Sequence, residues 1–292
     1  MTDDPKSNRS SEDRALSRRG FNALSVAAGV VIAASSATAR AADGAVVETD
    51  VAVKTPDGVC DAALFHPGGK GRWPTVLMWP DALGLRPAFR DMGRRLAGEG
   101  YAVLVPNPFY RTAKAPVLPS NFSFSNPADL AKLRPLMAPL TDDAVVRDAG
   151  AYLGFLDAQR VVSRKAKAGA VGYCMGGPLM LRTAAAAPDR IGAGCSFHGG
   201  GLVTDKPDSP HLLASRIKGS YYFGIATSDD QRQPDAKDKL KAAFAAAQVP
   251  AVIEVYEGAQ HGWCVPDFPV YDHDKAERAW GDMVALYKTA LV

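Results

Sequence analysis

Short apolar runs alternate with amphipathic stretches along most of the chain. Thr75–Trp79 is almost wholly apolar, as in a strand buried on both faces of a sheet, whereas Met92 and Leu96 lie four positions apart, as on one face of a helix. These patterns predict strands at Val46–Val53, Cys60–Phe65, Thr75–Trp79, Tyr101–Pro106, Ala168–Gly172, Gly192–Phe197, Ser220–Ala226 and Val252–Tyr256. It predicts helices at Phe89–Gly98, Asp142–Leu156, Gly177–Ala187, Pro234–Ala247 and Asp274–Leu291. The alternation predicts a single α/β domain with a mostly parallel central sheet flanked by helices.

One long stretch, Asn107–Pro139, departs from this alternation. It is rich in proline and has few clearly periodic positions. An excursion of this length inside a compact domain is usually a functional lid, or an insertion with a short helix of its own.

Composition narrows the range of function classes. The 292 residues are 47% hydrophobic and 22% charged, which is typical of a globular protein. The net charge is only +3 and the basic residues form no stripe, so we expect no nucleic-acid surface. Four cysteines in a chain of this length do not make a disulfide scaffold.

The N-terminal segment has the three-part layout of an export signal. A polar and charged stretch precedes Arg18-Arg19, an apolar stretch runs from Ala23 to Ala39, and small residues follow one another at alternate positions near its end. Ser17–Phe21 resembles the twin-arginine motif, which implies the Tat export machinery as a partner and a periplasmic protein. We expect residues 1–39 to be cleaved, leaving a domain at residues 45–292; the alternative is an anchor that is never cleaved.

The most informative motif is Gly172-Tyr173-Cys174-Met175-Gly176, between a predicted strand and a predicted helix. A sharp strand-to-helix turn strains the residue at its centre and leaves room only for glycine two positions to either side. The helix N-terminus would stabilise a Cys174 thiolate and supply one N–H, that of Met175, for an oxyanion. The alternative is a glycine-rich turn with a structural cysteine.

Candidate partners for Cys174 follow in the order acid, then histidine. Asp229 and Asp230 come directly after a predicted strand, and His261 lies in a loop before the last predicted helix. In this order a histidine acts as base toward the nucleophile, and a carboxylate orients the histidine. His198 follows another strand, where it either lines the pocket or takes a buried, hydrogen-bonded position. The remaining histidines are predicted to lie on the surface: His66, His211 and His273.

With these residues in place, the chain resembles the dienelactone hydrolase family of α/β-hydrolases from about Val46 to Leu291. The matching segments are Gly172–Gly177, the two aspartates after Ala226, Tyr256–Trp263, Asp81–Leu85 and Pro106–Tyr110. The resemblance implies an α/β-hydrolase fold and hydrolysis of a small ester or lactone through a cysteine thioester, with no cofactor and no metal. It implies that Ala82 supplies the second oxyanion N–H and that Asp81, in place of the glutamate frequent in the family, contacts the resting cysteine. Spacing slightly favours Asp230 over Asp229 as the acid.

One departure from the family pattern concerns the substrate. The family's dienelactone enzyme holds the substrate carboxylate with an arginine shortly after the histidine, whereas this chain has Trp263-Cys264-Val265-Pro266. Arg134 and Arg86 are the first alternatives for that role. We therefore expect an apolar wall here, and a preference for neutral esters and lactones.

We expect the hydrolase to be a monomer. Two other interpretations of the sequence compete with a hydrolase. In one, Cys174 is oxidised and pairs with Cys60 or Cys264, making the protein redox-active or structural. In the other, the protein is a binding module that has kept the fold and lost the chemistry. The order cysteine, aspartate, histidine argues against a pure binding module.

Overall fold

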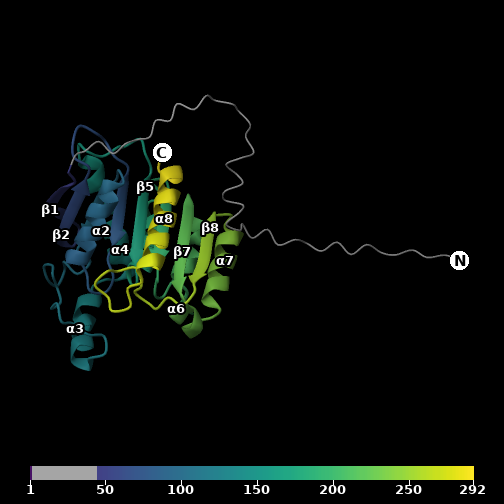
Figure 1. Ribbon diagram of the computed structural model, residues 1–292. Helices are drawn as coiled ribbons and strands as arrows, with labels where there is room; N and C mark the ends of the chain where they lie inside the picture. The colour runs from purple at the N-terminus through teal and green to yellow at the C-terminus, as the bar shows by residue number, and fades with distance from the viewer. Residues whose placement is uncertain (2–44) are drawn as a thin grey trace. The chain divides into compact units, whose positions relative to one another are not determined.

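A single eight-stranded sheet runs through the described part of the chain (Figure 1). The computed structural model describes Met1 and residues 45–292, so the expected export signal lies outside the described residues. The strands are β1 (Val47–Thr55), β2 (Gly58–His66), β3 (Thr75–Trp79), β4 (Ala102–Pro106), β5 (Ala168–Tyr173), β6 (Ile191–Phe197), β7 (Ser220–Ala226) and β8 (Ala251–Tyr256). All eight predicted strands are confirmed, with small differences at their ends.

The strand order is β1-β2-β4-β3-β5-β6-β7-β8. β1 pairs with β2, and β2 with β4, in antiparallel register, whereas every pair from β4 to β8 is parallel. Parallel neighbours need crossover connections, and helices supply them here. The carboxyl ends of β3, β5, β6, β7 and β8 therefore meet at one edge of the sheet, where α/β proteins place their ligand sites.

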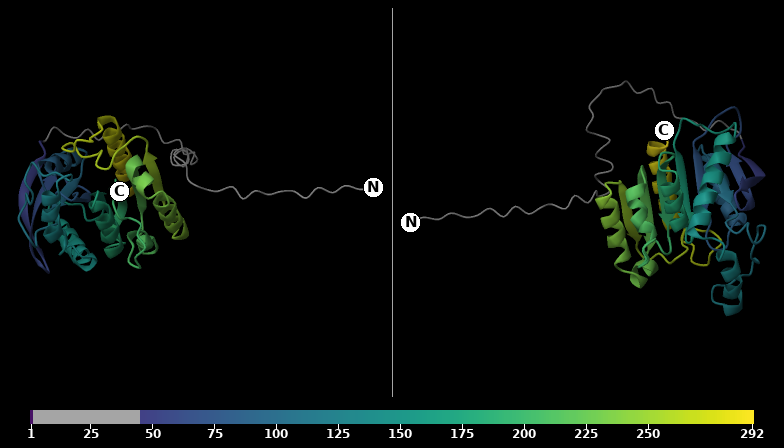
Figure 2. Two further views of the ribbon diagram at one scale, coloured as in Figure 1. Left: turned by 90° about the horizontal axis from the view of Figure 1, so that it is seen from below. Right: turned by 180° about the vertical axis from the view of Figure 1, so that it is seen from behind.

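Helices cover both faces of the sheet (Figures 1 and 2). Two helices pack on one face: α2 (Pro87–Gly98) and α8 (His273–Ala290). Three pack on the other: α4 (Asp142–Ala158), α5 (Gly176–Ala186) and α7 (Ala236–Ala246). Both faces bury apolar side chains, which explains why the parallel strands are apolar almost throughout. The predicted α/β fold is confirmed.

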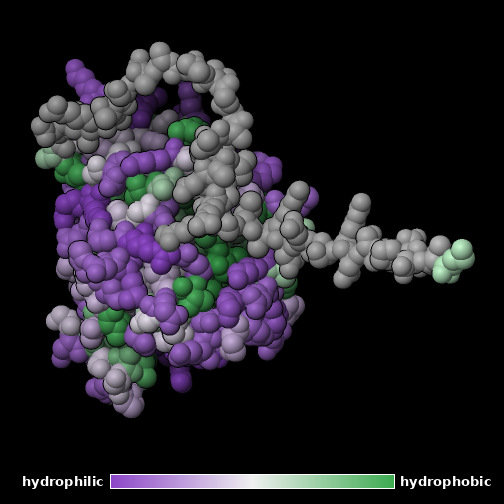
Figure 3. Space-filling view, turned by 45° about the vertical axis from the view of Figure 1, so that its right-hand side comes forward, coloured by the Kyte–Doolittle hydropathy of each residue, from purple (hydrophilic) through white to green (hydrophobic). Residues whose placement is uncertain are grey.

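The proline-rich excursion contains a helix of its own, α3 (Pro127–Met137), which protrudes at the lower left of Figure 1. Asn126 caps it by accepting a hydrogen bond from the Ala128 N–H. Leu133 and Leu136 are buried in the core, whereas Leu130 and Met137 are exposed. Figure 3 shows apolar residues in green on this protruding part, and further green patches among the hydrophilic residues of the same face.

Two short elements were not predicted: α6 (Thr227–Arg232) and the 3₁₀ helix η1 (Pro210–Arg216). Both are too short for a helical period to emerge from the sequence. None of the helices within the described residues is both long and apolar enough to cross a membrane.

Candidate active site

Cys174 stands at a sharp turn between β5 and α5. Its backbone has φ 52°, in the left-handed region that is strained for a residue with a side chain. A Cβ on Gly172 would come within 1.8 Å of the Gly176 carbonyl oxygen, and one on Gly176 within 2.4 Å of the Trp79 carbonyl oxygen. Both glycines of the motif are therefore required sterically, the second because β3 approaches the turn.

His261 is held beside Cys174 by the loop between β8 and α8. Its backbone N–H donates to Ser228 Oγ at 2.9 Å. Its Nε2 lies 3.1 Å from Cys174 Sγ, and its Nδ1 lies 2.8 Å from Asp229 Oδ2. The three side chains thus form one continuous hydrogen-bonded chain from carboxylate to sulfur.

The carboxylate that binds His261 is that of Asp229, and not that of Asp230, which spacing slightly favoured as the acid. Asp230 binds Lys237 Nζ at 2.7 Å instead. The reason is α6: both aspartates lie in its first turn, and successive helical residues point about 100° apart. Only one of them can face His261, while the other faces α7.

The environment of His261 favours the imidazolium form. Burial alone would lower its pKa, but the hydrogen bonds and charges of Asp229 and Cys174 outweigh burial and raise the pKa to about 10. A doubly protonated ring donates Nδ1–H to Asp229 and Nε2–H to Cys174 Sγ.

The expected oxyanion donors are the N–H groups of Met175 and Ala82, which follow the ends of the adjacent strands β5 and β3. Gly172 pairs with Trp79 in the parallel ladder of β5 and β3, and each donor lies three residues beyond its member of that pair. Within the described residues, neither N–H has a hydrogen-bond partner. The topology therefore leaves both groups available near Cys174.

Asp81 does not meet the expectation that it contacts the cysteine. Its carboxylate is 1% exposed and accepts two hydrogen bonds from Arg86, at 2.7 and 2.9 Å, and one from the Leu83 N–H. Burial raises the pKa of Asp81, and the ion pair with Arg86 opposes this shift. Arg86 also binds Asp267 in the loop that carries His261, at 2.6 and 2.8 Å. Asp81 and Arg86 thus join the segment after β3 to the histidine loop.

His198 fits neither alternative fully. It is 1% exposed, and within the described residues neither of its ring nitrogens has a hydrogen-bond partner. Its ring lies edge-on to His261, with 5.0 Å between centroids, and 5.3 Å from Trp263. Burial, together with His261, lowers its pKa well below the usual value, so the ring is neutral.

The apolar wall expected after His261 is mostly buried core. Trp263, Cys264 and Val265 are buried, and Trp263 stacks on Tyr256 with 4.9 Å between ring centroids. Pro266 alone among the four expected residues is exposed. The three buried side chains therefore anchor the loop that carries His261 in the hydrophobic core.

The other cysteines differ from Cys174. All four are free, and Cys174 alone is partly exposed. Burial raises the pKa of Cys60 to about 12 and raises the pKa values of Cys195 and Cys264 as well. The pairing of Cys174 with Cys60 or Cys264 is therefore absent from the described residues, and Cys174 is the thiol most accessible to a substrate.

The fold places Cys174 at a strand-to-helix elbow, and an aspartate and a histidine that are hydrogen-bonded to it in series follow along the chain. This arrangement defines an α/β-hydrolase-type protein. The dienelactone hydrolase family model matches residues 60–291, and the chain belongs to this family. The protein is therefore a homologue of hydrolases.

Known relatives cover most of the domain. The chain is 28% identical over 275 residues to a Methylorubrum extorquens protein provisionally named a carboxymethylenebutenolidase, covering 91% of this chain and 90% of the relative. It is 26% identical over 194 residues to the carboxymethylenebutenolidase of Rhodococcus opacus, covering 66% and 71%. A Klebsiella pneumoniae crystal structure, provisionally named a dienelactone hydrolase, shares the fold with a TM-score of 0.72 and 22% identity, covering 84% of this chain and 99% of that one.

Proposed function

We propose that the protein hydrolyses a small ester or lactone through a thioester on Cys174. The observation that carries this proposal is the chain from Asp229 to His261 to Cys174, with separations of 2.8 and 3.1 Å. Membership of the dienelactone hydrolase family supports the same reaction class.

In the first half of the reaction, the Cys174 thiolate attacks the acyl carbon. The N–H groups of Met175 and Ala82 stabilise the oxyanion that forms on the carbonyl oxygen. The tetrahedral intermediate collapses with cleavage of the C–O bond, and His261 Nε2–H gives its proton to the leaving alkoxide. An ester releases an alcohol, whereas a lactone yields a hydroxyl group tethered to the acyl chain.

In the second half, His261 acts as a general base. Its neutral Nε2 takes a proton from water while the water oxygen adds to the thioester carbonyl. Collapse expels the Cys174 thiolate and releases a carboxylic acid, which restores the thiolate and imidazolium. Asp229 keeps the ring orientation and offsets its positive charge through both halves.

We further propose that neutral substrates are preferred over anionic ones. Arg86 is occupied by Asp81 and Asp267, and moving it to a substrate carboxylate would leave the buried Asp81 charge unpaired. Arg134 is exposed on α3, where it lines an open surface depression formed by other residues of α3. These placements support the expectation drawn from the missing arginine after His261.

Replacement of single cysteines tests the reaction. Cys174→Ala should lower the hydrolysis rate of an activated neutral ester by several orders of magnitude, as loss of a covalent nucleophile does. Cys195→Ala is the matched control, because Cys195 is buried within β6, and it should keep most of the activity. Equal activity in Cys174→Ala and Cys195→Ala would refute the mechanism.

For the precursor, we propose export by the Tat machinery to the periplasm, with cleavage near Ala39. Arg18-Arg19 and the apolar stretch after it support this proposal. Intact-mass analysis of the protein from the periplasmic fraction should show loss of about the first 39 to 42 residues. A full-length species confined to the cytoplasm would contradict it.

A further inference from the structure

Three ligand-type side chains converge at the carboxyl ends of parallel strands in one half of the sheet. Cys174 follows β5, His198 follows β6 and His261 follows β8. One atom from each, the cysteine sulfur and one ring nitrogen of each histidine, lies within 4.8 Å of the other two. Within the described residues this is the cluster of histidine, cysteine and acidic side chains that meets the geometry of a metal site.

His198 is the member that the hydrolytic reaction does not use. It is held in the left-handed region with φ 41°, and its backbone N–H donates to the Gly224 carbonyl oxygen at 2.8 Å. Its fully buried ring has no hydrogen-bond partner within residues 45–292. Burying an unpaired polar group costs free energy, as does a strained backbone, so a ring kept in this position points to a ligand.

We propose that Cys174, His198 and His261 bind one Zn²⁺ ion, and that this binding reversibly inhibits the hydrolase. Zinc prefers thiolate and imidazole ligands. In a tetrahedral zinc site such ligand atoms lie roughly 3.5 Å apart. The separation of Cys174 Sγ and His261 Nε2 is 3.1 Å, so these two need little movement. The His198 nitrogen lies within 4.8 Å of both atoms and so needs to approach by at most about 1.3 Å.

The surroundings of His261 suit a metal ligand. Asp229 accepts its Nδ1–H, which leaves Nε2 as the ligating nitrogen in the carboxylate–histidine–metal arrangement common in zinc proteins. Three protein ligands leave a fourth position for water. Zinc binds the Cys174 thiolate, the neutral His198 ring and His261 Nε2, and the proton that Nε2 carries in the imidazolium form is released to solvent.

Zinc binding and hydrolysis exclude each other, because the metal occupies both reacting atoms. The sulfur lone pair that would attack the acyl carbon is bound to zinc, as is the Nε2 lone pair that would accept a proton. Zinc should therefore inhibit competitively with the substrate, and a chelator should restore the activity.

Metal titration of the reduced, full chain tests the site without using its activity. We would measure Zn²⁺ affinity by competition with a chromophoric chelator, and use Co²⁺ to detect thiolate ligation by its charge-transfer absorption. The wild type should bind one ion per chain. His198→Phe, which keeps an aromatic ring, should weaken binding by at least about tenfold, and Cys174→Ala should abolish the thiolate band.

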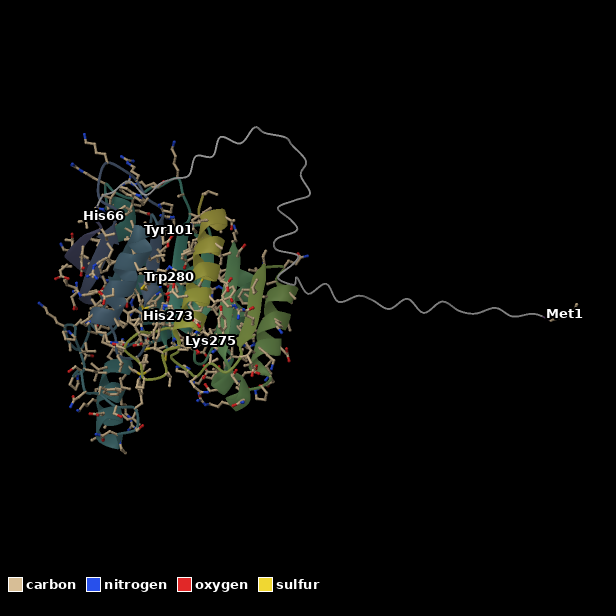
Figure 4. The ribbon with its side chains drawn as sticks, in the orientation of Figure 1. Met1, His66, Tyr101, His273, Lys275 and Trp280 are labelled. Carbon is tan, nitrogen blue, oxygen red and sulfur yellow. The ribbon has the colours of Figure 1, made fainter. Side chains whose placement is uncertain are left out.

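His66→Phe is the matched control, since His66 is at the upper end of the sheet in Figure 4, away from the histidine loop at the bottom. It should bind as the wild type does. His198→Gln, smaller and polar, gives a second measurement if the phenylalanine variant fails to fold. Wild-type affinity in the folded His198 variants, or no binding by the wild type, would overturn the proposal. Hydrolysis without zinc binding would refute this site alone, and zinc binding without hydrolysis would refute the proposed function alone.

Discussion

Replacing Asp229 by asparagine separates its role from that of its neighbour most clearly. The change is nearly isosteric, but the amide group of asparagine can donate to His261 Nδ1, which leaves Nε2 protonated in the neutral ring and unable to act as a base. It also removes the negative charge 2.8 Å from that nitrogen. In catalytic triads this substitution lowers kcat by about 10⁴, which corresponds to roughly 5.5 kcal/mol in the barrier.

Asp230→Asn provides the control within the same helical turn. It breaks only the ion pair with Lys237, and a solvent-screened pair of this kind contributes little to stability. Its kcat should stay within about threefold of the wild type, because the contacts of His261 with Asp229 and Cys174 do not change. The assay is steady-state hydrolysis of a neutral activated ester, with thermal unfolding measured for each variant. Equal losses in the two variants, or a larger loss in Asp230→Asn, would refute the assignment of the acid.

The remaining predictions concern stability and specificity. Gly172→Ala should destabilise the fold by about 3 kcal/mol or more, because its Cβ would lie 1.8 Å from a backbone oxygen. Gly150 lies in α4, and a Cβ added there would meet no atom within 4 Å, so Gly150→Ala should stabilise the fold by about 0.5–1 kcal/mol. Chemical denaturation measures the free energy of unfolding of both variants, and similar effects would contradict the steric argument. The pKa of His261 is raised in the folded protein, so its stabilisation is complete below pH 6.5 and is lost as the pH rises through about 10. Denaturation between these pH values should therefore show a larger fall in unfolding free energy for the wild type than for Asp229→Asn, and equal falls would refute this coupling. For a neutral lactone, kcat/KM should exceed that of a carboxylated analogue by about 10² or more, and a preference for the anion would show that an arginine is recruited.

Patterns local in the sequence predicted the features that depend on local physics. Buried strands such as Thr75–Trp79 are apolar on both faces. Gly172 and Gly176 lie so close to backbone oxygen atoms that a side chain at either position would clash. Strand order then brings His261 to the cysteine, because the parallel strands end at one edge.

Features that depend on which way a side chain turns could not be predicted. The choice between Asp229 and Asp230 depends on α6, a helix of six residues that shows no periodicity. The turn of Arg86 back to Asp81 depends on a second partner, Asp267, that is 181 residues away from Arg86 along the chain. Among the described residues His198 has no hydrogen-bond partner for its ring, because that ring is buried beside Trp263, a tertiary contact.

The proposed reaction requires that Cys174 carries the acyl group. The decisive measurement is rapid acid quenching of the protein with an activated neutral ester, followed by peptide mass spectrometry, because acid preserves a thioester. We expect a transient acyl mass on the peptide that contains Cys174, and we expect it to disappear in Cys174→Ala together with the activity. Undiminished turnover with no acylated Cys174, or an acyl group on another residue that turns over at the same rate, would contradict the proposed reaction.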